Sequence, residues 1–98
     1  MSERVLGGFV YVLGSALGPD RRTYVGWSVD IESRLALHNA GMGARSTRGR
    51  VWVLLYAERY ATRREAMSRE YTLKRDRRFR AALVHHLAPP AAPAREPQ

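Results

Sequence analysis

The chain has 98 residues, which suffice for one small domain and leave no room for a second hydrophobic core. Its 17 Lys and Arg against 9 Asp and Glu give a net charge of +8, so we expect a polyanionic partner such as nucleic acid. The absence of cysteine excludes disulfides, thiolate metal sites and cysteine nucleophiles. No apolar run reaches the roughly 20 residues that span a bilayer, so we expect a soluble, cytoplasmic protein without membrane contacts.

Two short strands are predicted near the N-terminus. Residues 9–13, Phe-Val-Tyr-Val-Leu, are β-branched and aromatic between glycines, and residues 23–25 form a second such run. Gly-Pro-Asp at 18–20 supplies turn chemistry between them. If paired positions sum to an odd number, for example Leu13 opposite Arg22, then Tyr11 and Tyr24 lie on the same face of the sheet.

A short amphipathic helix is expected next, followed by a loop and a third strand. Ser28 or Asp30 can cap a helix that runs to about Asn39, with Gly41 as its stop. Residues 40–50 mix glycine and arginine without periodicity and predict a basic loop. Residues 51–58 are nearly continuous in apolar residues, which is typical of a central strand.

The remaining segments are predicted to be helical up to a tail. Thr62 and Glu65 form a capping box, in which each residue satisfies an amide of the other, so a helix is expected over 63–75. A last helix is expected over about 77–87. Residues 88–98 hold four of the five prolines, so we expect a domain over 1–87 and a disordered tail over 88–98. The order β-β-α-β-α-α predicts an α+β fold with helices packed on a three-stranded sheet.

Glu70 is the most informative single residue. On a helical wheel of residues 63–75 it lies inside the apolar arc, between Ala66 and Leu73 on one side and Met67 and Tyr71 on the other. Burying an unpaired carboxylate costs several kcal/mol, so Glu70 needs a cationic partner. That partner is either a nearby Arg in a structural ion pair or a hard divalent metal ion, which prefers oxygen ligands.

Four further side chains combine chemistry with suggestive spacing. Arg34 and His38 are four residues apart on the first helix, so they project from the same side. They are either a surface Arg with a half-buried His, or a phosphate clamp beside a group that moves protons near neutrality. Tyr11 and Tyr24 are either packing residues or part of a catalytic network, in which cationic neighbours would lower the phenol pKa.

The positive charge is concentrated in one part of the chain. Residues 43–80 contain twelve of the basic residues and four acids, whereas the segments before and after are each neutral. This run is either a solvated surface or a nucleic-acid interface. For the interface we predict contacts from six residues: Arg45, Arg48, Arg50, Arg63, Lys74 and Arg77.

Taken in order, four motifs resemble the GIY-YIG nuclease family. They are Phe-Val-Tyr at 9–11, Tyr-Val-Gly at 24–26, Arg-Leu-Ala-Leu-His at 34–38, and Arg-Glu at 69–70. The resemblance spans about residues 8–84 and is to small stand-alone bacterial members, similar to the catalytic domain of structure-specific junction endonucleases. It implies a three-stranded antiparallel sheet flanked by helices, and metal-dependent cleavage of a phosphodiester with Mg²⁺ or Mn²⁺.

The resemblance also implies roles for individual residues. Tyr11 would position or deprotonate the attacking water, and Tyr24 would support that network. Arg34 would steady charge on the phosphoryl oxygens, with His38 one turn later. Glu70 would bind the metal. All five are thus candidate catalytic residues, and Gly26 matches the glycine that leaves space beside the site.

Two departures from the family pattern stand out. The first motif reads Phe-Val-Tyr rather than Gly-Ile-Tyr, which keeps the tyrosine. No asparagine follows Glu70, although many family members use one there; this leaves open a weak enzyme, or one that needs a protein partner to supply specificity.

Three functions are weighed on these grounds. The first is a divalent-metal-dependent DNA endonuclease in repair or recombination, acting on branched or nicked DNA. The second is a non-catalytic nucleic-acid-binding module on the same fold. The third is a structural or ribosome-associated basic protein, which explains the charge but not the set formed by Tyr11, Tyr24, Arg34 and Glu70.

Overall fold

The computed structural model describes residues 7–89, and its element order confirms the predicted one. The elements are β1 (Gly8–Leu17), β2 (Asp20–Ser28), α1 (Ile31–Asn39), the 3₁₀ turn η1 (Arg45–Thr47), β3 (Val53–Tyr60), α2 (Arg63–Arg75) and α3 (Arg77–Val84). The last helix ends at Val84 rather than near residue 87, and the predicted loop contains η1. The predicted disordered tail lies outside the described residues from residue 90 onward. None of the helices in the described range is long and apolar enough to cross a membrane.

The three strands form an antiparallel sheet in the order β2-β1-β3, so the prediction that residues 51–58 are the central strand is wrong. The central strand is β1, which is almost completely buried, whereas Val53 and Leu54 of β3 are exposed. Trp52 is buried but precedes the strand, and its indole N–H donates to Thr47 O at 2.7 Å. The apolar run therefore reflects the anchoring of the loop by Trp52 and a partly exposed edge strand, and not a strand buried on both faces.

The β1–β2 register has the predicted odd sum, and it places Tyr11 and Tyr24 on the same face. Leu13 pairs with Tyr24, however, and not with Arg22. The shift by two arises because the hairpin closes at Leu17 and Asp20 through a two-residue turn. Gly18, in that turn, has φ +57°, a value that favours glycine.

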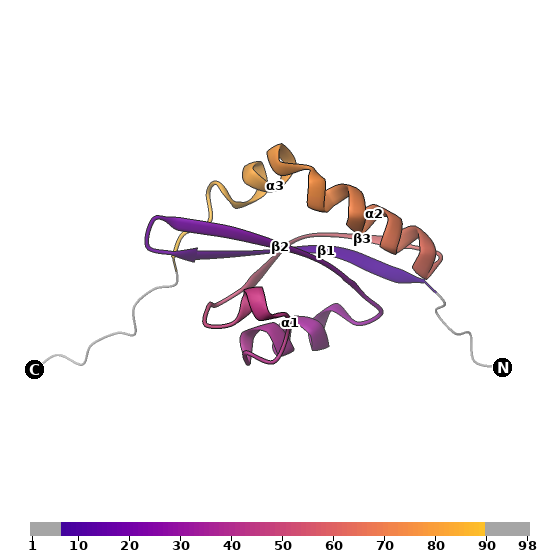
Figure 1. The fold of residues 1–98 in the computed structure, drawn as a ribbon, viewed down its shortest axis with the longest axis horizontal. Coiled ribbons are helices and arrows are strands. Elements are labelled where there is room, and N and C mark those ends of the chain that lie inside the picture. Colours follow the sequence, from indigo (N-terminus) through magenta and orange to yellow (C-terminus); the bar gives the residue numbers. More distant parts are fainter. Residues whose placement is uncertain (1–6, 90–98) are drawn as a thin grey trace, which may run out of the picture.

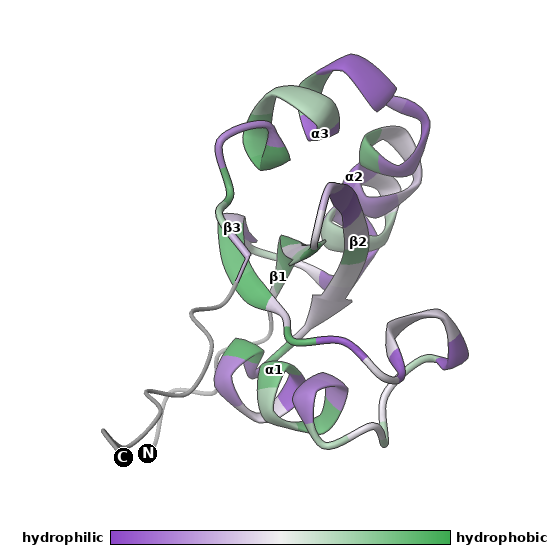
Figure 2. Ribbon diagram, turned by 90° about the vertical axis from the view of Figure 1, so that its left-hand side faces the viewer, coloured by the Kyte–Doolittle hydropathy of each residue, from purple (hydrophilic) through white to green (hydrophobic). Residues whose placement is uncertain are grey.

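Helices cover both faces of the sheet, α2 and α3 on one and α1 on the other (Figure 1). Because side chains alternate along a strand, Val10 and Val12 of β1 pack with Ala66 and Leu73 of α2. Tyr11 and Leu13 point to the opposite face, where Trp52, Tyr24, Ile31 and Leu35 surround them. Figure 2 shows the hydrophobic parts of the strands between these two helical layers.

Side-chain caps set where the helices begin. Of the two predicted caps of α1, Asp30 is the one used, since its Oδ1 accepts from Ser33 N at 3.1 Å. Thr62 caps α2 by accepting from Glu65 N at 3.1 Å, as predicted. The Glu65 carboxylate accepts from the Thr62 hydroxyl at 2.9 Å, whereas the capping box predicted a bond to the Thr62 amide.

Side chains gathered around the single carboxylate of Glu58 join α2 to the sheet. Glu58 of β3 accepts hydrogen bonds from the hydroxyls of Tyr56 and Tyr60, and Arg69 of α2 donates to it from Nε at 2.8 Å. Burial opposes the charge of Glu58, but these hydrogen bonds from Arg69, Tyr56 and Tyr60 outweigh it and hold the pKa of that carboxyl below its usual value. The Arg69–Glu58 contact thus joins α2 to β3 one residue before Glu70.

Candidate active site

All five predicted catalytic residues line one pocket of about 300 Å³. Its lining is formed by Tyr11, Tyr24, Gly26, Trp27, Arg34, His38, Ala44 and Glu70. These residues come from β1, β2, α1, the loop before η1 and α2. β2 is an edge strand, and the pocket lies where elements of both helical layers meet beside it. Residues far apart in the sequence, from Tyr11 to Glu70, thus share one pocket.

Tyr11 and His38 form a hydrogen-bonded pair inside the pocket. The Tyr11 hydroxyl lies 3.2 Å from His38 Nε2, and both side chains are buried. Tyr24 packs on the same imidazole, with ring centroids 4.7 Å apart. A Cβ at Gly26 would lie 2.5 Å from the Tyr11 hydroxyl oxygen, so only glycine leaves room for the phenol there.

Thr47 determines which nitrogen of His38 carries the proton. Its hydroxyl donates to Ala44 O at 2.8 Å, and its oxygen lies 2.8 Å from His38 Nδ1. Since the single hydroxyl proton goes to Ala44 O, Thr47 accepts from the Nδ1–H of His38. Nε2 then keeps its lone pair and accepts from Tyr11. No sequence pattern pointed to Thr47, a fully buried residue within the arginine-rich loop.

The pKa values of this pair differ from the expectation for Tyr11. Burial, reinforced by Tyr24 and Glu70, raises the pKa of Tyr11 to about 12, although Arg34 acts in the opposite direction. The cationic neighbour therefore does not overcome desolvation. Burial, and the positive charge of Arg34, lower the pKa of His38, so the imidazole is neutral near pH 7. The pair consists of a protonated phenol and an imidazole able to accept its proton.

Arg34 offers an unshared guanidinium to the pocket. Its side chain is exposed, and within residues 7–89 no hydrogen bond or ion pair engages it. A guanidinium in this state can form two parallel hydrogen bonds to a phosphate. Arg34 thus places a bidentate anion-binding group beside the Tyr11–His38 pair.

Glu70 has a different setting from the one that the helical wheel predicted. Met67 and Tyr71 are half or more exposed, so Glu70 lies at the border of the buried face and not within it. Its charged partner among the described residues is Lys74, with Nζ 3.6 Å from Oε2, and not an arginine. The Glu70 side chain is 21% exposed and opens into the pocket. A surface lysine at this distance leaves the carboxylate oxygens accessible to a further cation.

The donor set fits a hydrated divalent ion. Within residues 7–89 no cluster of three or more His, Asp or Glu side chains could enclose a metal. Mg²⁺ does not need such a cluster, since it is commonly held by one or two carboxylates together with water and substrate phosphates. Glu70 in a polar pocket supplies that single carboxylate.

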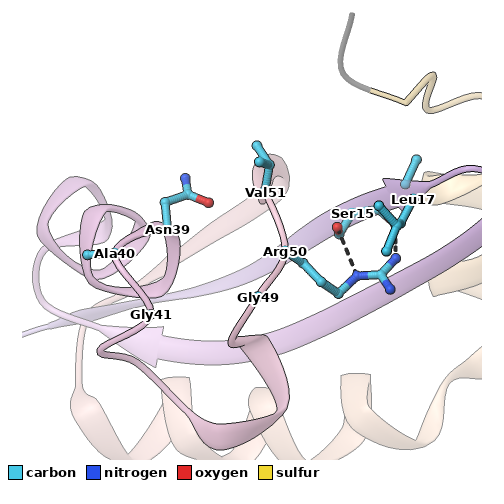
Figure 3. Close-up of a pocket in the computed structure, with 9 residues that line it drawn as sticks. Ser15, Leu17, Asn39, Ala40, Gly41, Gly49, Arg50 and Val51 are labelled. Atoms are coloured by element: carbon cyan, nitrogen blue, oxygen red, sulfur yellow. Dashed lines mark hydrogen bonds between the residues drawn. The ribbon is translucent and has the colours of Figure 1, made fainter. Parts of the chain in front are cut away.

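The residues predicted to contact nucleic acid fall into two groups. Arg45, Arg48, Arg63, Lys74 and Arg77 are exposed. Arg50 differs: its side chain is 7% exposed and donates to Ser15 Oγ at 3.0 Å, Asp20 Oδ2 at 3.1 Å and Asp20 O at 3.1 Å. Figure 3 shows it reaching toward Ser15 and not outward. Its donors hold the β1–β2 hairpin to the loop, so we exclude Arg50 from the interface.

The hollow beside Arg50, of about 440 Å³, offers little chemistry. The side-chain amide of Asn39 is engaged on both sides by the backbone of Trp52, at 3.0 and 2.7 Å. The Ser15 hydroxyl and the Arg50 guanidinium bind each other (Figure 3). The candidate chemistry therefore lies in the smaller pocket that Tyr11 and Glu70 line.

Comparisons with known proteins place the chain in a family. The family model of the GIY-YIG catalytic domain matches residues 7–82. A UPF0213 protein of Streptococcus pneumoniae is 45% identical over 71 residues, covering 71% of this chain and 69% of the relative. UPF0213 proteins of Clostridium perfringens and Natronomonas pharaonis are 44% and 43% identical, over 68% and 67% of this chain and 70% and 75% of theirs. No solved structure matches the chain significantly.

The matched model identifies the class of the protein as a nuclease-type domain. The chain belongs to the GIY-YIG family, as its motifs predicted. The printed names of the UPF0213 relatives state no activity.

Proposed function

We propose that the protein is a divalent-metal-dependent endonuclease that hydrolyses phosphodiester bonds in DNA. The observation that carries this proposal is the convergence of the Tyr11–His38 pair, Arg34 and Glu70 in one pocket at the β2 edge. Branched or nicked DNA, a role in repair or recombination, a cytoplasmic setting and a partner that adds specificity remain expectations from the sequence.

The Tyr11–His38 pair supplies a route for a proton. As an attacking water loses a proton to the phenol oxygen of Tyr11, the phenol proton moves to His38 Nε2, which becomes an imidazolium. Ionisation of the phenol before the reaction is not a workable route at pH 7, because almost none of a phenol whose pKa is about 12 is then ionised. The coupled transfer avoids a free phenolate. Thr47 accepts from Nδ1–H throughout, which holds the ring in place.

Arg34 and Glu70, which also line the pocket, would counter the charge on the phosphate. Arg34 would hold two phosphoryl oxygens in its fork. Glu70, together with those oxygens, would hold Mg²⁺ or Mn²⁺, which when bound supplies positive charge to the phosphate and acidifies bound water. The exposed residues Arg45 and Arg48 follow Ala44, which lines the pocket. They would therefore contact the DNA backbone on either side of the phosphate that the pocket holds.

The test is cleavage of nicked and branched DNA with Mg²⁺ or Mn²⁺ and with chelator. We expect cutting that chelator abolishes and that falls at least 100-fold in Tyr11→Phe and Glu70→Ala. Binding should persist in Glu70→Ala, since removing an acid does not weaken attraction to phosphate. Lys74→Ala is the matched control, because it removes the partner of Glu70 and leaves the carboxylate. Its cutting is compared at saturating DNA, since Lys74 is also a predicted DNA contact.

Two results would contradict the proposal. Unchanged cutting by Glu70→Ala would remove the metal assignment. DNA binding by the folded wild-type protein with no cutting under any metal condition would favour the non-catalytic binding module instead. Melting curves of each variant show whether a loss of activity is a loss of fold.

A further inference from the structure

A second hollow, of about 210 Å³, opens beside the candidate active site. Trp27 and Arg34 line both hollows, whereas Ser28, Val29 and Arg63 line only the second. Sharing two side chains makes them neighbours on one surface, with Arg34 at their boundary. A chain molecule held in the first can therefore extend into the second along Trp27 and Arg34.

The polar groups of the second hollow are suited to an anion. No carboxylate lines it. The Ser28 hydroxyl is occupied, since it donates to Asp30 O at 3.1 Å and accepts from Asp30 N at 3.0 Å. The Asp30 carboxylate is engaged by Ser33 at the start of α1. Within residues 7–89, neither Arg34 nor Arg63 has an acidic partner, so two guanidinium groups face the hollow without compensation.

Helix stability does not account for the position of Arg63. It is the first residue of α2, where the partial positive charge of the helix dipole disfavours a cation. The next residue, Arg64, lines a different hollow together with Glu65, Arg69 and Tyr60. The two adjacent arginines therefore serve different surfaces, and only Arg63 adjoins the candidate active site.

We propose that the second hollow is a phosphate subsite. It binds the phosphate adjacent, along the same strand, to the one held by Arg34 and Glu70, and Trp27 forms the apolar wall against the intervening sugar. This inference rests on the proposed function, because it takes the first pocket to hold a nucleic-acid phosphate. Arg63 is the specificity-determining residue of the subsite, since Arg34 holds the first phosphate and Arg63 is the cation that remains to bind the second.

The experiment uses small ligands that contain no phosphodiester bond, so the protein has no diester to cleave. Calorimetry compares thymidine 3′,5′-bisphosphate with thymidine 3′-phosphate and thymidine 5′-phosphate, in Mg²⁺ at low salt. Wild-type protein should bind the bisphosphate about tenfold more tightly than the better monophosphate, as one added charge-assisted contact provides. Arg63→Ala should remove this advantage, so that the bisphosphate binds no more tightly than the better monophosphate. Arg63→Lys should keep part of it, because lysine supplies charge without the fork.

Arg64→Ala is the matched control, because it removes the same charge one residue along α2. It should keep the full preference for the bisphosphate. Arg63→Ala should melt no lower than wild type, since the cation it removes does not favour the helix. Equal losses in the Arg63 and Arg64 variants, or a wild-type protein without a preference for the bisphosphate, would overturn the subsite.

The two proposals fail in different ways. If wild-type protein never cuts DNA but Arg63→Ala still removes the bisphosphate preference, the nuclease proposal fails and the subsite stands. If metal-dependent cutting is found but Arg63→Ala and Arg64→Ala bind the bisphosphate equally, the subsite fails and the nuclease proposal stands.

Discussion

Thr47 Oγ1 lies 2.8 Å from His38 Nδ1 while its own proton is donated to Ala44 O. This fixes the tautomer in which Nε2 accepts from Tyr11. We expect Thr47→Val, which keeps the shape and removes the hydroxyl, to lower cleavage about 10- to 100-fold, by analogy with the loss of a group that orients a metal-bound histidine. Thr47→Ser should keep most of the activity.

The readout that separates orientation from simple loss of packing is the imidazole ¹⁵N spectrum. In wild-type protein His38 should show a protonated Nδ1 and an unprotonated Nε2. Thr47→Val should show a mixture of tautomers, and Thr47→Ser the wild-type pattern. A Thr47→Val protein with unchanged tautomer and unchanged rate would show that the hydroxyl has no positioning role.

The helices, strands and turns could be predicted from the sequence because each has a local cause. The turn at Gly18, the cap at Thr62 and the β-branched and aromatic run of β1 all act within a few residues. The neighbours of a strand are not local. An apolar run at 51–58 indicated a central strand, yet β1 is the strand that pairs on both sides. Hydrophobicity reports burial, and burial of Trp52 has a cause outside the sheet.

The candidate site was predictable to a similar extent. Family motifs pointed to Tyr11, Arg34 and Glu70, which do share a pocket. Thr47 could not be found, because its role depends on a loop folding back over His38, nine residues away. Arg50 and Arg48 stand in one basic segment with no pattern to distinguish them, and only the fold shows that one is buried and the other exposed.

The pKa of His38 predicts the acid side of the pH profile. Only the neutral imidazole accepts from Tyr11, and burial together with Arg34 lowers the His38 pKa below 6.5. Cleavage should therefore hold as the pH falls to 6.5 and decline only below it. Ionisation of Tyr11 should not limit the rate up to pH 10, because its pKa is about 12. Rates measured from pH 5 to 10, with a non-titrating His38→Gln variant, check this.

Folding stability should also depend on the protonation of His38, and the lowered pKa sets the direction of this dependence. An unfolded chain binds a proton on His38 near pH 6.5, whereas the folded protein binds it only at lower pH. The contribution of His38 is therefore fully present above pH 6.5 and is lost as the pH falls through the window below it. The difference in melting temperature between the wild type and His38→Gln should be smaller at pH 5 than at pH 7.5. If the cleavage rate of the wild-type protein already declined at a pH centred above 6.5, both the predicted pH–rate profile and the predicted pH dependence of stability would be wrong.

Gly26 is expected to tolerate no side chain while Tyr11 is present. A Cβ there would lie 2.5 Å from the Tyr11 hydroxyl oxygen and 2.7 Å from Cζ. Gly26→Ala should therefore displace the phenol and lower cleavage about 100-fold, the scale of a misplaced catalytic group. The stability cost should be smaller in a Tyr11→Phe background, where the nearest atom is gone. Additive costs in the double-mutant cycle would show that the two positions do not interact.

Arg50 and Arg48 form a matched pair for separating stability from DNA binding. Arg50→Ala removes the bonds that join the loop to Ser15 and Asp20, so we expect a loss of about 2 kcal/mol, or a melting temperature lower by about 10 °C. Arg48→Ala should leave melting within about 2 °C, because exposed substitutions usually change stability by less than ~0.5 kcal/mol. It should lower the slope of log K against log salt by about 0.9, the value for one phosphate contact. Thermal melts and salt titrations of DNA binding measure both quantities. The opposite assignment, with Arg48→Ala melting early and Arg50→Ala changing only the salt slope, would contradict the placement of Arg50 as a clamp between hairpin and loop.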